Sequence, residues 1–327
     1  MGDMIDVVAL GELLIDFTPA GVSSAGNALF ERNPGGAPAN VLAAVTRLGG
    51  TGAFIGKVGD DAFGRYLKTV LDGLGVDSRG LRFTKEADTT LAFVHLDDRG
   101  DRSFSFYRRP GADTTLKIQE VDTTLVDQTR IFHFGSLSLT DEPARRATLA
   151  TAAAAKSKGA LVSYDPNWRP ALWESEAAAK SGMLSGLPFA DILKVSEVEL
   201  EFLTGERDLA AGGRKLFTGD LRLLLVTLGP KKCYFRCAKG TGLVPTYDVD
   251  VVDTTGAGDA FLGGLLFRIA RSGRRFSELS FDEIEEMVDY ANAVGSLCAT
   301  KRGAIPAMPS PEEVEACRSG VPKLVPV

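Results

Sequence analysis

The residues of this chain that are best suited to chemistry are seven consecutive ones, 253–259, with the sequence Asp-Thr-Thr-Gly-Ala-Gly-Asp. The β-branched run 249–252 precedes them and the small, apolar run 260–267 follows, which predicts a strand, a tight glycine turn and a helix. Backbone N–H groups at such a helix start bind anions. A carboxylate at Asp259 beside that site suits a base that takes a proton from an alcohol while the amides hold an incoming phosphoryl group. The run therefore favours phosphoryl transfer to a small-molecule hydroxyl, and the alternative is a structural turn with an ordinary first-turn aspartate.

Alternating β and α segments must position this run. Short apolar stretches predict strands, and stretches with helical spacing lie between them. At 327 residues, this alternation predicts an α/β fold with three layers, α/β/α, and a mostly parallel central sheet. Ligands bind such sheets at the carboxyl ends of the strands. The expected strands are 7–10, 53–55, 131–134, 161–164, 192–195 and 223–227, and the expected helices are 38–48, 61–74, 142–158, 198–203 and a long amphipathic one over 284–298.

Two regions interrupt this alternation. Residues 12–33 and about 81–112 have little helical signal, and 91–96 and 103–107 read as strands joined by a turn at 97–100. We expect both regions to form a small β-sheet lid over the main domain. A lid suits phosphoryl transfer because it excludes water, which would otherwise accept the phosphoryl group.

Composition excludes several classes of protein. The net charge of −6 argues against nucleic acid and anionic membranes as main partners. No run of 18 or more apolar residues and no signal-peptide or transit-peptide pattern occurs, so we expect a cytoplasmic protein. The cysteines have no metal-binding or redox spacing and are expected to be free thiols. Both histidines, His95 and His133, lie in strand-like runs and are expected to be structural.

These segments together resemble the ribokinase-like carbohydrate kinases, the PfkB family, and most of all its fructokinases. Residues 253–259 with the following glycine pair 263–264 resemble the family's C-terminal signature, and 35–40 followed by Gly49 and Gly59 resemble its N-terminal signature. Leu42 departs from that pattern, which usually has a small residue there. The resemblance implies one ribokinase-like kinase domain over 1–327.

The resemblance also implies roles for single residues. Asp259 matches the catalytic base, and the amides of Gly256, Ala257 and Gly258 match the anion hole for the γ-phosphoryl group. The residues that match the sugar site are Asp16, Gly35, Gly36, Asn40, Arg108 and Arg169. Asp16 as a polar turn residue, and Arg108 and Arg169 as surface salt-bridge partners, are the alternatives.

The nucleotide side departs more from the family. Its Asn-x-x-Glu motif is matched by Ser196 and Glu199, and Glu199 is expected to orient magnesium-bound water unless it is a plain exposed helix charge. Lys232 stands where many relatives have a glycine. Asn292 is expected either to face the adenine or to be an ordinary surface amide. The other residues that match the nucleotide site are Lys194, Thr227, Gly229 and Gly258.

A monovalent cation, usually K⁺, often lies beside the anion hole in this family. Asp253 and Thr255 match its contributors, and 300–304 matches the second loop. The resemblance thus implies ATP, Mg²⁺ and K⁺ as ligands.

The resemblance leaves the sugar open between two acceptors. Residues 165–173 and 106–108 are shared by fructokinases and 2-keto-3-deoxygluconate kinases, whereas 11–17 and 132–139 are most like fructokinases. We therefore expect phosphorylation of the 6-hydroxyl of D-fructose by ATP. The alternatives are a 2-keto-3-deoxygluconate kinase, another PfkB sugar kinase and a catalytically silent sugar or nucleotide sensor. Exposed strand edges of the lid also suggest a homodimer.

Overall fold

The computed structural model describes residues 4–96 and 102–324. Its centre is a nine-stranded sheet in the order β13-β12-β11-β10-β9-β8-β1-β4-β5, and neighbours from β11 to β5 are parallel. At the opposite edge, β12 and β13 pair antiparallel. The strands are β1 (Ile5–Leu10), β4 (Gly52–Gly59), β5 (Asp77–Thr84), β8 (Thr129–Gly135), β9 (Leu161–Asp165), β10 (Ile192–Ser196), β11 (Leu223–Thr227), β12 (Lys232–Cys237) and β13 (Gly240–Pro245).

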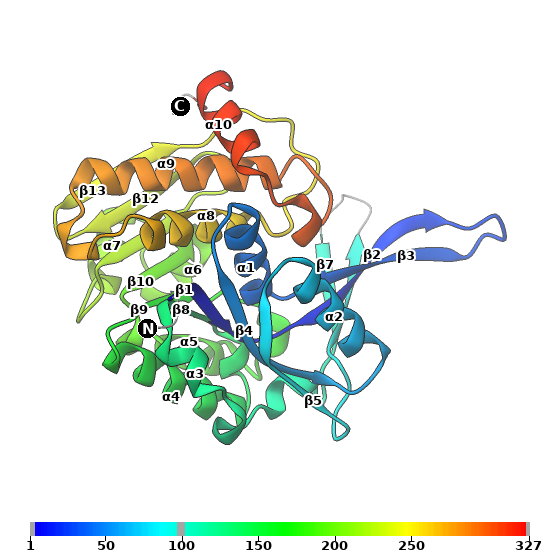
Figure 1. The fold of residues 1–327 in the computed structure, drawn as a ribbon. Coiled ribbons are helices and arrows are strands. Elements are labelled where there is room, and N and C mark those ends of the chain that lie inside the picture. The colour runs from blue at the N-terminus through cyan, green and yellow to red at the C-terminus, as the bar shows by residue number, and fades with distance from the viewer. Residues whose placement is uncertain (1–3, 97–101, 325–327) are drawn as a thin grey trace.

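Helices cover both faces of this sheet (Figure 1). One core, with Phe54 and Leu262, lies under α1 (Ala37–Arg47), α2 (Ala62–Gly73), α8 (Ala257–Arg271) and α9 (Phe281–Cys298). The other core, with Phe132 and Tyr164, lies under α3 (Thr123–Asp127), α4 (Ala144–Ser157), α5 (Glu176–Leu184), α6 (Glu197–Thr204) and α7 (Leu209–Leu216). The last helix, α10 (Pro311–Gly320), packs on α9. The predicted three-layer α/β/α fold is confirmed.

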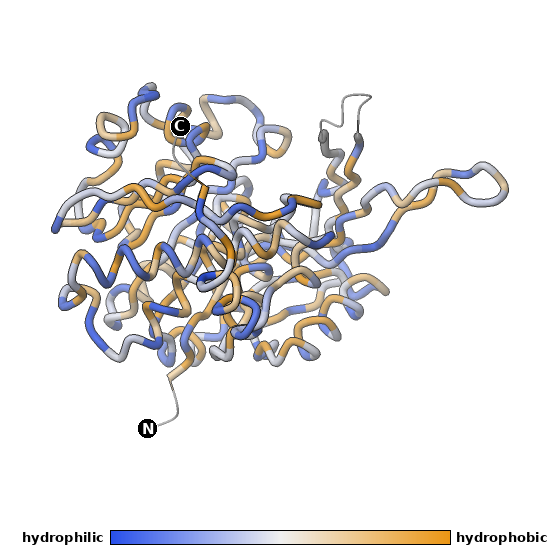
Figure 2. The backbone as a smooth tube through the Cα atoms, turned by 90° about the horizontal axis from the view of Figure 1, so that it is seen from above, coloured by the Kyte–Doolittle hydropathy of each residue, from blue (hydrophilic) through white to orange (hydrophobic). Residues whose placement is uncertain are grey.

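A second, four-stranded sheet lies beside the first. Its order is β3-β2-β6-β7, with β3 (Ala28–Gly35), β2 (Leu14–Val22), β6 (Leu91–Leu96) and β7 (Arg102–Tyr107). The ribbon of β2 and β3 projects from the body in both Figures 1 and 2. Residues 81–84, which the sequence analysis assigned to the lid, belong instead to β5 of the large sheet. The turn expected at 97–100 lies outside the described residues.

The strand expected at 249–252 is absent, so this prediction was wrong. Val251 and Val252 are 53% and 57% exposed, and the amides of Val252 and Asp253 donate to the Ala299 carbonyl after α9. β-Branched residues favour a strand only where a partner strand and a packed face are available. Here β13 already closes the edge of the large sheet. The segment therefore crosses the surface as an irregular connection to α8.

The two histidines lie on strands and the four cysteines are free thiols, as the sequence analysis expected. His133 is buried on β8 against the Ser163 hydroxyl, and His95 lies on β6 beside Ser105. All four cysteines are free and buried. Within the described ranges, none of the helices combines the length and apolarity needed to cross a bilayer.

Candidate active site

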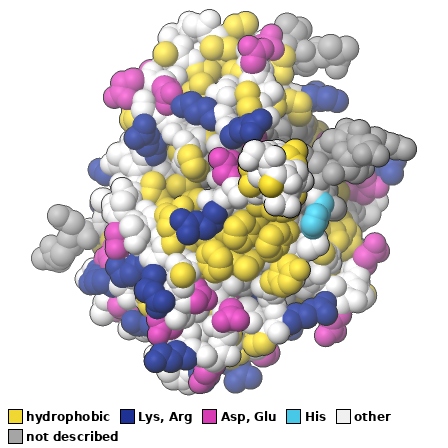
Figure 3. All heavy atoms as spheres, turned by 90° about the vertical axis from the view of Figure 1, so that its right-hand side faces the viewer, with side chains coloured by type: hydrophobic (Ala, Val, Ile, Leu, Met, Phe, Trp, Pro, Cys, Tyr) yellow, Lys and Arg dark blue, Asp and Glu magenta, His cyan; other side chains and the backbone are white. Residues whose placement is uncertain are grey.

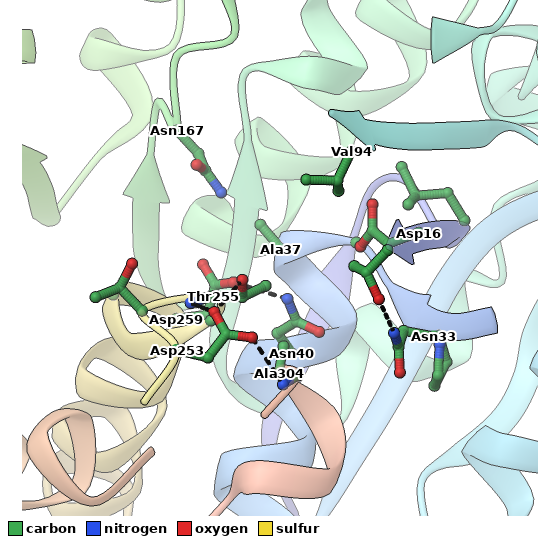
Figure 4. Close-up of a pocket in the computed structure, with 18 of the residues that line it drawn as sticks. Asp16, Asn33, Ala37, Asn40, Val94, Asn167, Asp253, Thr255, Asp259 and Ala304 are labelled. Carbon is green, nitrogen blue, oxygen red and sulfur yellow. Dashed lines mark hydrogen bonds between the residues drawn. The ribbon is translucent and has the colours of Figure 1, made fainter. Parts of the chain in front are cut away.

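A cavity of about 740 Å³ opens where the two sheets meet the first turn of α8. Its walls come from β2 and β3 of the small sheet, from the carboxyl ends of β9 and β10, and from the loop before α8. Figure 4 shows side chains from these separate elements turned toward one another. The predicted site residues that line it are Asp16, Gly36, Asn40, Arg169, Lys194, Asp253, Thr255, Gly256, Gly258 and Asp259.

Asp259 lies in the first turn of α8 and is 8% exposed. Its Oδ2 accepts a hydrogen bond of 2.8 Å from the Asn40 amide of α1 (Figure 4). Burial raises the pKa of Asp259 to about 6, the Asn40 bond and the nearby Lys194 and Arg169 charges oppose that rise, and the Asp165 carboxylate adds to it. A carboxylate that is ionised at neutral pH but readily protonated is suited to general base catalysis.

The glycines before Asp259 allow a close approach of backbone. Gly256 is the N-cap of α8 with φ 76°, and a Cβ there would lie 2.4 Å from the Ala304 Cβ. The Ala257 amide donates to the Thr254 carbonyl at 3.2 Å, which closes the turn. The first N–H groups of an α-helix have no carbonyl partner within the helix, so the Gly258 amide points out of the helix start as a donor. This arrangement favours an anion at the cavity wall.

Lys194 adds a cation to the same wall. A Cβ on Gly258 would lie 3.1 Å from the Lys194 Nζ, and that amine is 2.8 Å from the Asp165 Oδ2. Burial acts against its charge, but the Asp165 and Glu199 carboxylates outweigh burial and raise the pKa of Lys194. The amine is therefore charged at all physiological pH values, beside the helix start.

A second acidic centre faces Asp259 across the cavity. Burial raises the pKa of Asp16 on β2 to about 6, the Arg169 charge lowers it, and the Asp259 charge raises it. Gly35 lies directly against it, since a Cβ there would come within 2.1 Å of the Asp16 Oδ2. Gly36 has φ 113°, a conformation that favours glycine. Both glycines therefore let the backbone approach Asp16 and the cavity.

Two further polar groups complete this wall. The Asn40 Oδ1 is buried and has no partner within the described structure, although its Nδ2 binds Asp259. The Arg169 guanidinium donates to the Trp168 carbonyl at 3.1 Å and lines the cavity. Carboxylates, an amide and a guanidinium in one cavity provide the acceptors and donors that a polyhydroxylated ligand needs.

Arg108 is not brought into the cavity. It is 8% exposed, its guanidinium pairs with Asp113 at 2.6 Å, and it also donates to the Thr140 hydroxyl and the Leu137 carbonyl. These bonds tie the end of β7 to the loop after β8. The alternative of a surface salt bridge was wrong, because the ion pair is buried.

Of the predicted nucleotide residues, Lys194 and Gly258 line the cavity, whereas Ser196, Glu199, Thr227, Gly229 and Asn292 lie outside its wall. Ser196 and Glu199 form a capping box at the start of α6, and the Glu199 Oε1 also accepts the Trp168 amide at 2.6 Å. Glu199 is 6% exposed, so the exposed-charge alternative was wrong. Thr227 ends β11 next to Ser196 of β10, and Gly229 follows in the turn to β12 with φ 58°.

Asn292 is not an ordinary surface amide. It is 3% exposed, and its amide donates to the carbonyls of Val244 and Pro245 at 3.0 and 3.2 Å. Its amide nitrogen therefore links α9 to β13. The periodicity of α9 could have indicated this burial, because Asn292 lies four residues after the buried Val288 and three before the buried Gly295.

Asp253 joins the two loops expected around a monovalent cation. Its Oδ1 accepts the Thr255 amide and hydroxyl at 2.9 and 2.7 Å, and its Oδ2 accepts the Gly303 amide at 3.0 Å. Among residues 4–96 and 102–324, no group of three or more His, Cys, Asp or Glu side chains is arranged to hold a metal ion.

Sequence reasoning assigned no role to three polar residues at or beside the cavity, namely Glu12, Asn167 and Asp165. Glu12 is 2% exposed and lines it, and burial raises its pKa to about 7. Asn167 has φ 48° and lines it beside Trp168. Asp165 is the partner of Lys194. The signal that could have found Glu12 and Asp165 is their position, because each is an acid at or just after the carboxyl end of a buried parallel strand.

The chain is similar to known sugar kinases along nearly its whole length. It is 50% identical to fructokinase-1 of Oryza sativa subsp. japonica, covering 94% of this chain and 96% of the relative. A fructokinase structure from Xylella fastidiosa with bound ATP superposes with a TM-score of 0.90 at 37% identity, covering 96% and 98% of the two chains. A double mutant of Vibrio cholerae O395 fructokinase, bound to fructose, ADP and potassium ion, gives 0.86 at 33% identity, covering 97% and 99%. The model of the pfkB family carbohydrate kinases matches residues 4–311, and the chain belongs to that family.

Proposed function

We propose that this protein is an ATP-dependent fructokinase that phosphorylates the 6-hydroxyl of D-fructose. The observation that carries the proposal is the juxtaposition of Asp259, the Gly256–Gly258 turn and Asp16 around one cavity. A fructokinase relative at 50% identity over 94% of the chain supports fructose as the acceptor, and a fructokinase structure with bound ATP supports ATP as the donor.

Asp259 accepts the proton of the sugar hydroxyl in this mechanism. The hydroxyl oxygen then forms a bond to the γ-phosphorus, the bond from that phosphorus to the bridging oxygen breaks, and ADP leaves. Negative charge on the transferring group is stabilised by the N–H groups of Gly256 and Gly258 and by the Lys194 ammonium, whereas the Ala257 N–H donates within the turn. The carboxylate of Asp259 must be ionised at the start, which a pKa of about 6 allows at neutral pH.

The sugar is held from the opposite wall. Asp16 accepts sugar hydroxyls, the backbone at Gly35 and Gly36 approaches the ring, and the buried Asn40 Oδ1 accepts a further hydroxyl. Arg169 contributes a donor. The small sheet closes over this wall as a lid and excludes water.

The nucleotide extends from the anion turn toward Thr227, Gly229 and the α9–β13 side around Asn292. Mg²⁺ supplies charge neutralisation at the phosphates when it is bound. The described residues fit an ion held mainly by phosphates and water, because the Glu199 Oε1, which accepts the Trp168 amide, can accept a second hydrogen bond, here from metal-bound water. K⁺ would be bound by the loops that Asp253 joins, as the potassium ion of the Vibrio relative suggests.

Two copies of the chain are proposed to pair through their lids. On one face of the small sheet, Phe93 contacts Phe17, Phe30 and Tyr107, and Tyr107 is 66% exposed. Figure 3 shows apolar side chains gathered on the side from which the β2–β3 ribbon projects. The edge strands β3 and β7 of the small sheet and its apolar face could each pair with the same surface of a second copy of the chain. The cytoplasm, where ATP is available and thiols stay reduced, is the proposed compartment.

A panel of sugars tests this function directly. Purified protein is assayed for ADP release with fructose, 2-keto-3-deoxygluconate and other sugars, with and without K⁺. Fructose is expected to have the highest kcat/KM, with fructose 6-phosphate as product. A preference for 2-keto-3-deoxygluconate would instead assign Arg169 and Arg302, which both line the cavity, to a sugar carboxylate. No turnover with any sugar would favour a sensor.

A further inference from the structure

The first turn of α1 is capped by a side chain from a different part of the chain. Its N-cap is Gly36, which has no side chain, and the Ala37 amide donates instead to the Glu12 Oε1 at 2.9 Å. Glu12 follows the end of β1 and is 2% exposed. The two segments touch closely, since a Cβ on Gly36 would lie 2.4 Å from the Glu12 carbonyl oxygen. Glu12 therefore supplies the missing cap from outside the helix.

This cap lies one helical turn from the proposed base. Asn40 is the fourth residue of α1; its amide donates to the Gly36 carbonyl at 2.9 Å and its side chain to the Asp259 Oδ2 at 2.8 Å. A helix whose first turn moves also moves the side chains of that turn. The position of the Asn40 donor thus depends on how firmly the Gly36–Ala37 end is held.

Keeping a carboxyl group at position 12 is costly for the fold. Its Oε2 is buried without a hydrogen-bond partner among the described residues, and such a group destabilises a protein unless something compensates for it. The charged groups that act on it are Asp113 and Arg108, which are paired with each other. Stability alone does not explain a buried, half-satisfied carboxyl group beside the cavity.

We propose that Glu12 is a positioning residue for the phosphoryl-transfer site: by capping α1, it holds Asn40 in its hydrogen bond with Asp259. The inference rests on the proposed function, in which Asp259 is the base. Glu12 acts through Ala37 and Asn40 and needs no contact with the substrate.

The consequence is a measurable change at Asp259. The Asn40 bond lowers the pKa of Asp259, against burial, which raises it. If α1 loses its cap and Asn40 shifts, burial is less opposed and the pKa of Asp259 rises. The acid limb of the pH profile then moves to higher pH. The other groups that act on Asp259 stay in place, namely Asp16, Asp165, Arg169, Lys194 and Cys298.

Two substitutions of similar volume separate the cap from the charge. Glu12→Met removes the acceptor, whereas Glu12→Gln keeps an Oε1 that can accept the Ala37 amide, and both remove the ionisable group. We expect the acid limb of kcat/KM for fructose to move up by about one pH unit in Glu12→Met, the size of one lost hydrogen bond to a charged group. Glu12→Gln is expected to keep the wild-type limb. Asn40→Ala should shift the limb as Glu12→Met does, and the double variant Glu12→Met/Asn40→Ala should shift it no further.

An unmoved acid limb in Glu12→Met, with only a lower melting temperature, would overturn the proposal and leave Glu12 a purely structural residue. Asp259→Asn is measured in parallel to separate this inference from the proposed function. If Asp259→Asn is inactive and the acid limb of Glu12→Met is unmoved, only this inference is refuted. If Asp259→Asn is active, the proposed function is refuted. Should Glu12→Met not fold, amide hydrogen exchange decides. The Ala37 amide is expected to exchange at least about 100-fold slower than in an unfolded chain, both in the wild type and in Glu12→Gln. Unprotected exchange at Ala37 in the wild type would contradict the cap.

Discussion

Replacing Gly35 with alanine should damage the sugar site without damaging the fold. The new Cβ would lie 2.1 Å from the Asp16 Oδ2, so the Asp16 carboxylate must move. Gly35 does not have a positive φ, so alanine causes no backbone strain there. The displaced atom is the far end of a side chain, which can turn away at little cost in folding free energy. The perturbation is thus confined to the direction of one carboxylate.

The magnitude follows from the bond that is lost. A hydrogen bond to a charged group contributes about 1.5–3 kcal/mol, which corresponds to a rise of about 10- to 150-fold in the KM for fructose. Steady-state kinetics with varied fructose and saturating ATP measure this rise, and thermal unfolding checks the fold. Gly73→Ala is the matched control, because a Cβ at Gly73 meets nothing within 4 Å.

The result that would refute this reasoning is a fructose KM within about twofold of the Gly73→Ala control. Asp16→Ala provides a further check. It should raise the KM at least as much as Gly35→Ala, and combining the two changes should add little, since both remove the same interaction.

Three other predictions concern charge and assembly. First, kcat/KM for fructose should fall as the pH drops below about 6, because burial raises the pKa of Asp259 and a protonated base cannot accept a proton; a profile that is flat down to pH 4.5 would contradict this. Second, the pKa of Asp259 is raised from 3.8 in the unfolded chain to about 6 in the folded protein, so the folded state favours the protonated carboxyl group. The stability that protonated Asp259 allows is fully present below pH 3.8 and is lost as the pH rises through 6. Asp259→Asn should therefore be more stable than the wild type at pH 8, by up to about 3 kcal/mol in urea unfolding, and the gain should vanish near pH 4; an equal gain at both pH values would argue against it. Third, Tyr107→Glu should convert a lid-mediated dimer into monomers in sedimentation velocity, with exposed Val198→Glu on α6 as the control, and a wild-type monomer would remove the basis for that dimer.

Much of this fold could be predicted because local pattern and tertiary packing agree. The apolar strands at 131–134 and 223–227 are buried on both faces, and the helix at 284–298 buries the face that its periodicity indicates. The run 249–252 failed because its β-branched residues have no partner strand, which no local pattern reveals.

The candidate site could be predicted only in part, for a similar reason. The glycine turn and Asp259 could be predicted, because glycine is required where the backbone turns tightly and the start of the following helix binds anions. The protein partners of Arg108 and Asn292 could not be predicted, because their donors bind Asp113 and the carbonyls of Val244 and Pro245 in distant segments. Glu12 was missed because its partner, the Ala37 amide, is 25 positions away in the sequence. Such pairings depend on how distant segments pack.

The central claim is that Asp259 accepts the proton of the sugar hydroxyl. Turnover of fructose and ATP by Asp259→Asn at pH 8 tests it most directly, because the substitution keeps the shape of the side chain and removes its basicity. We expect kcat to fall by about 10²- to 10⁴-fold, with circular dichroism and thermal unfolding showing an intact fold. A folded Asp259→Asn protein with kcat within a few-fold of the wild type would contradict the account.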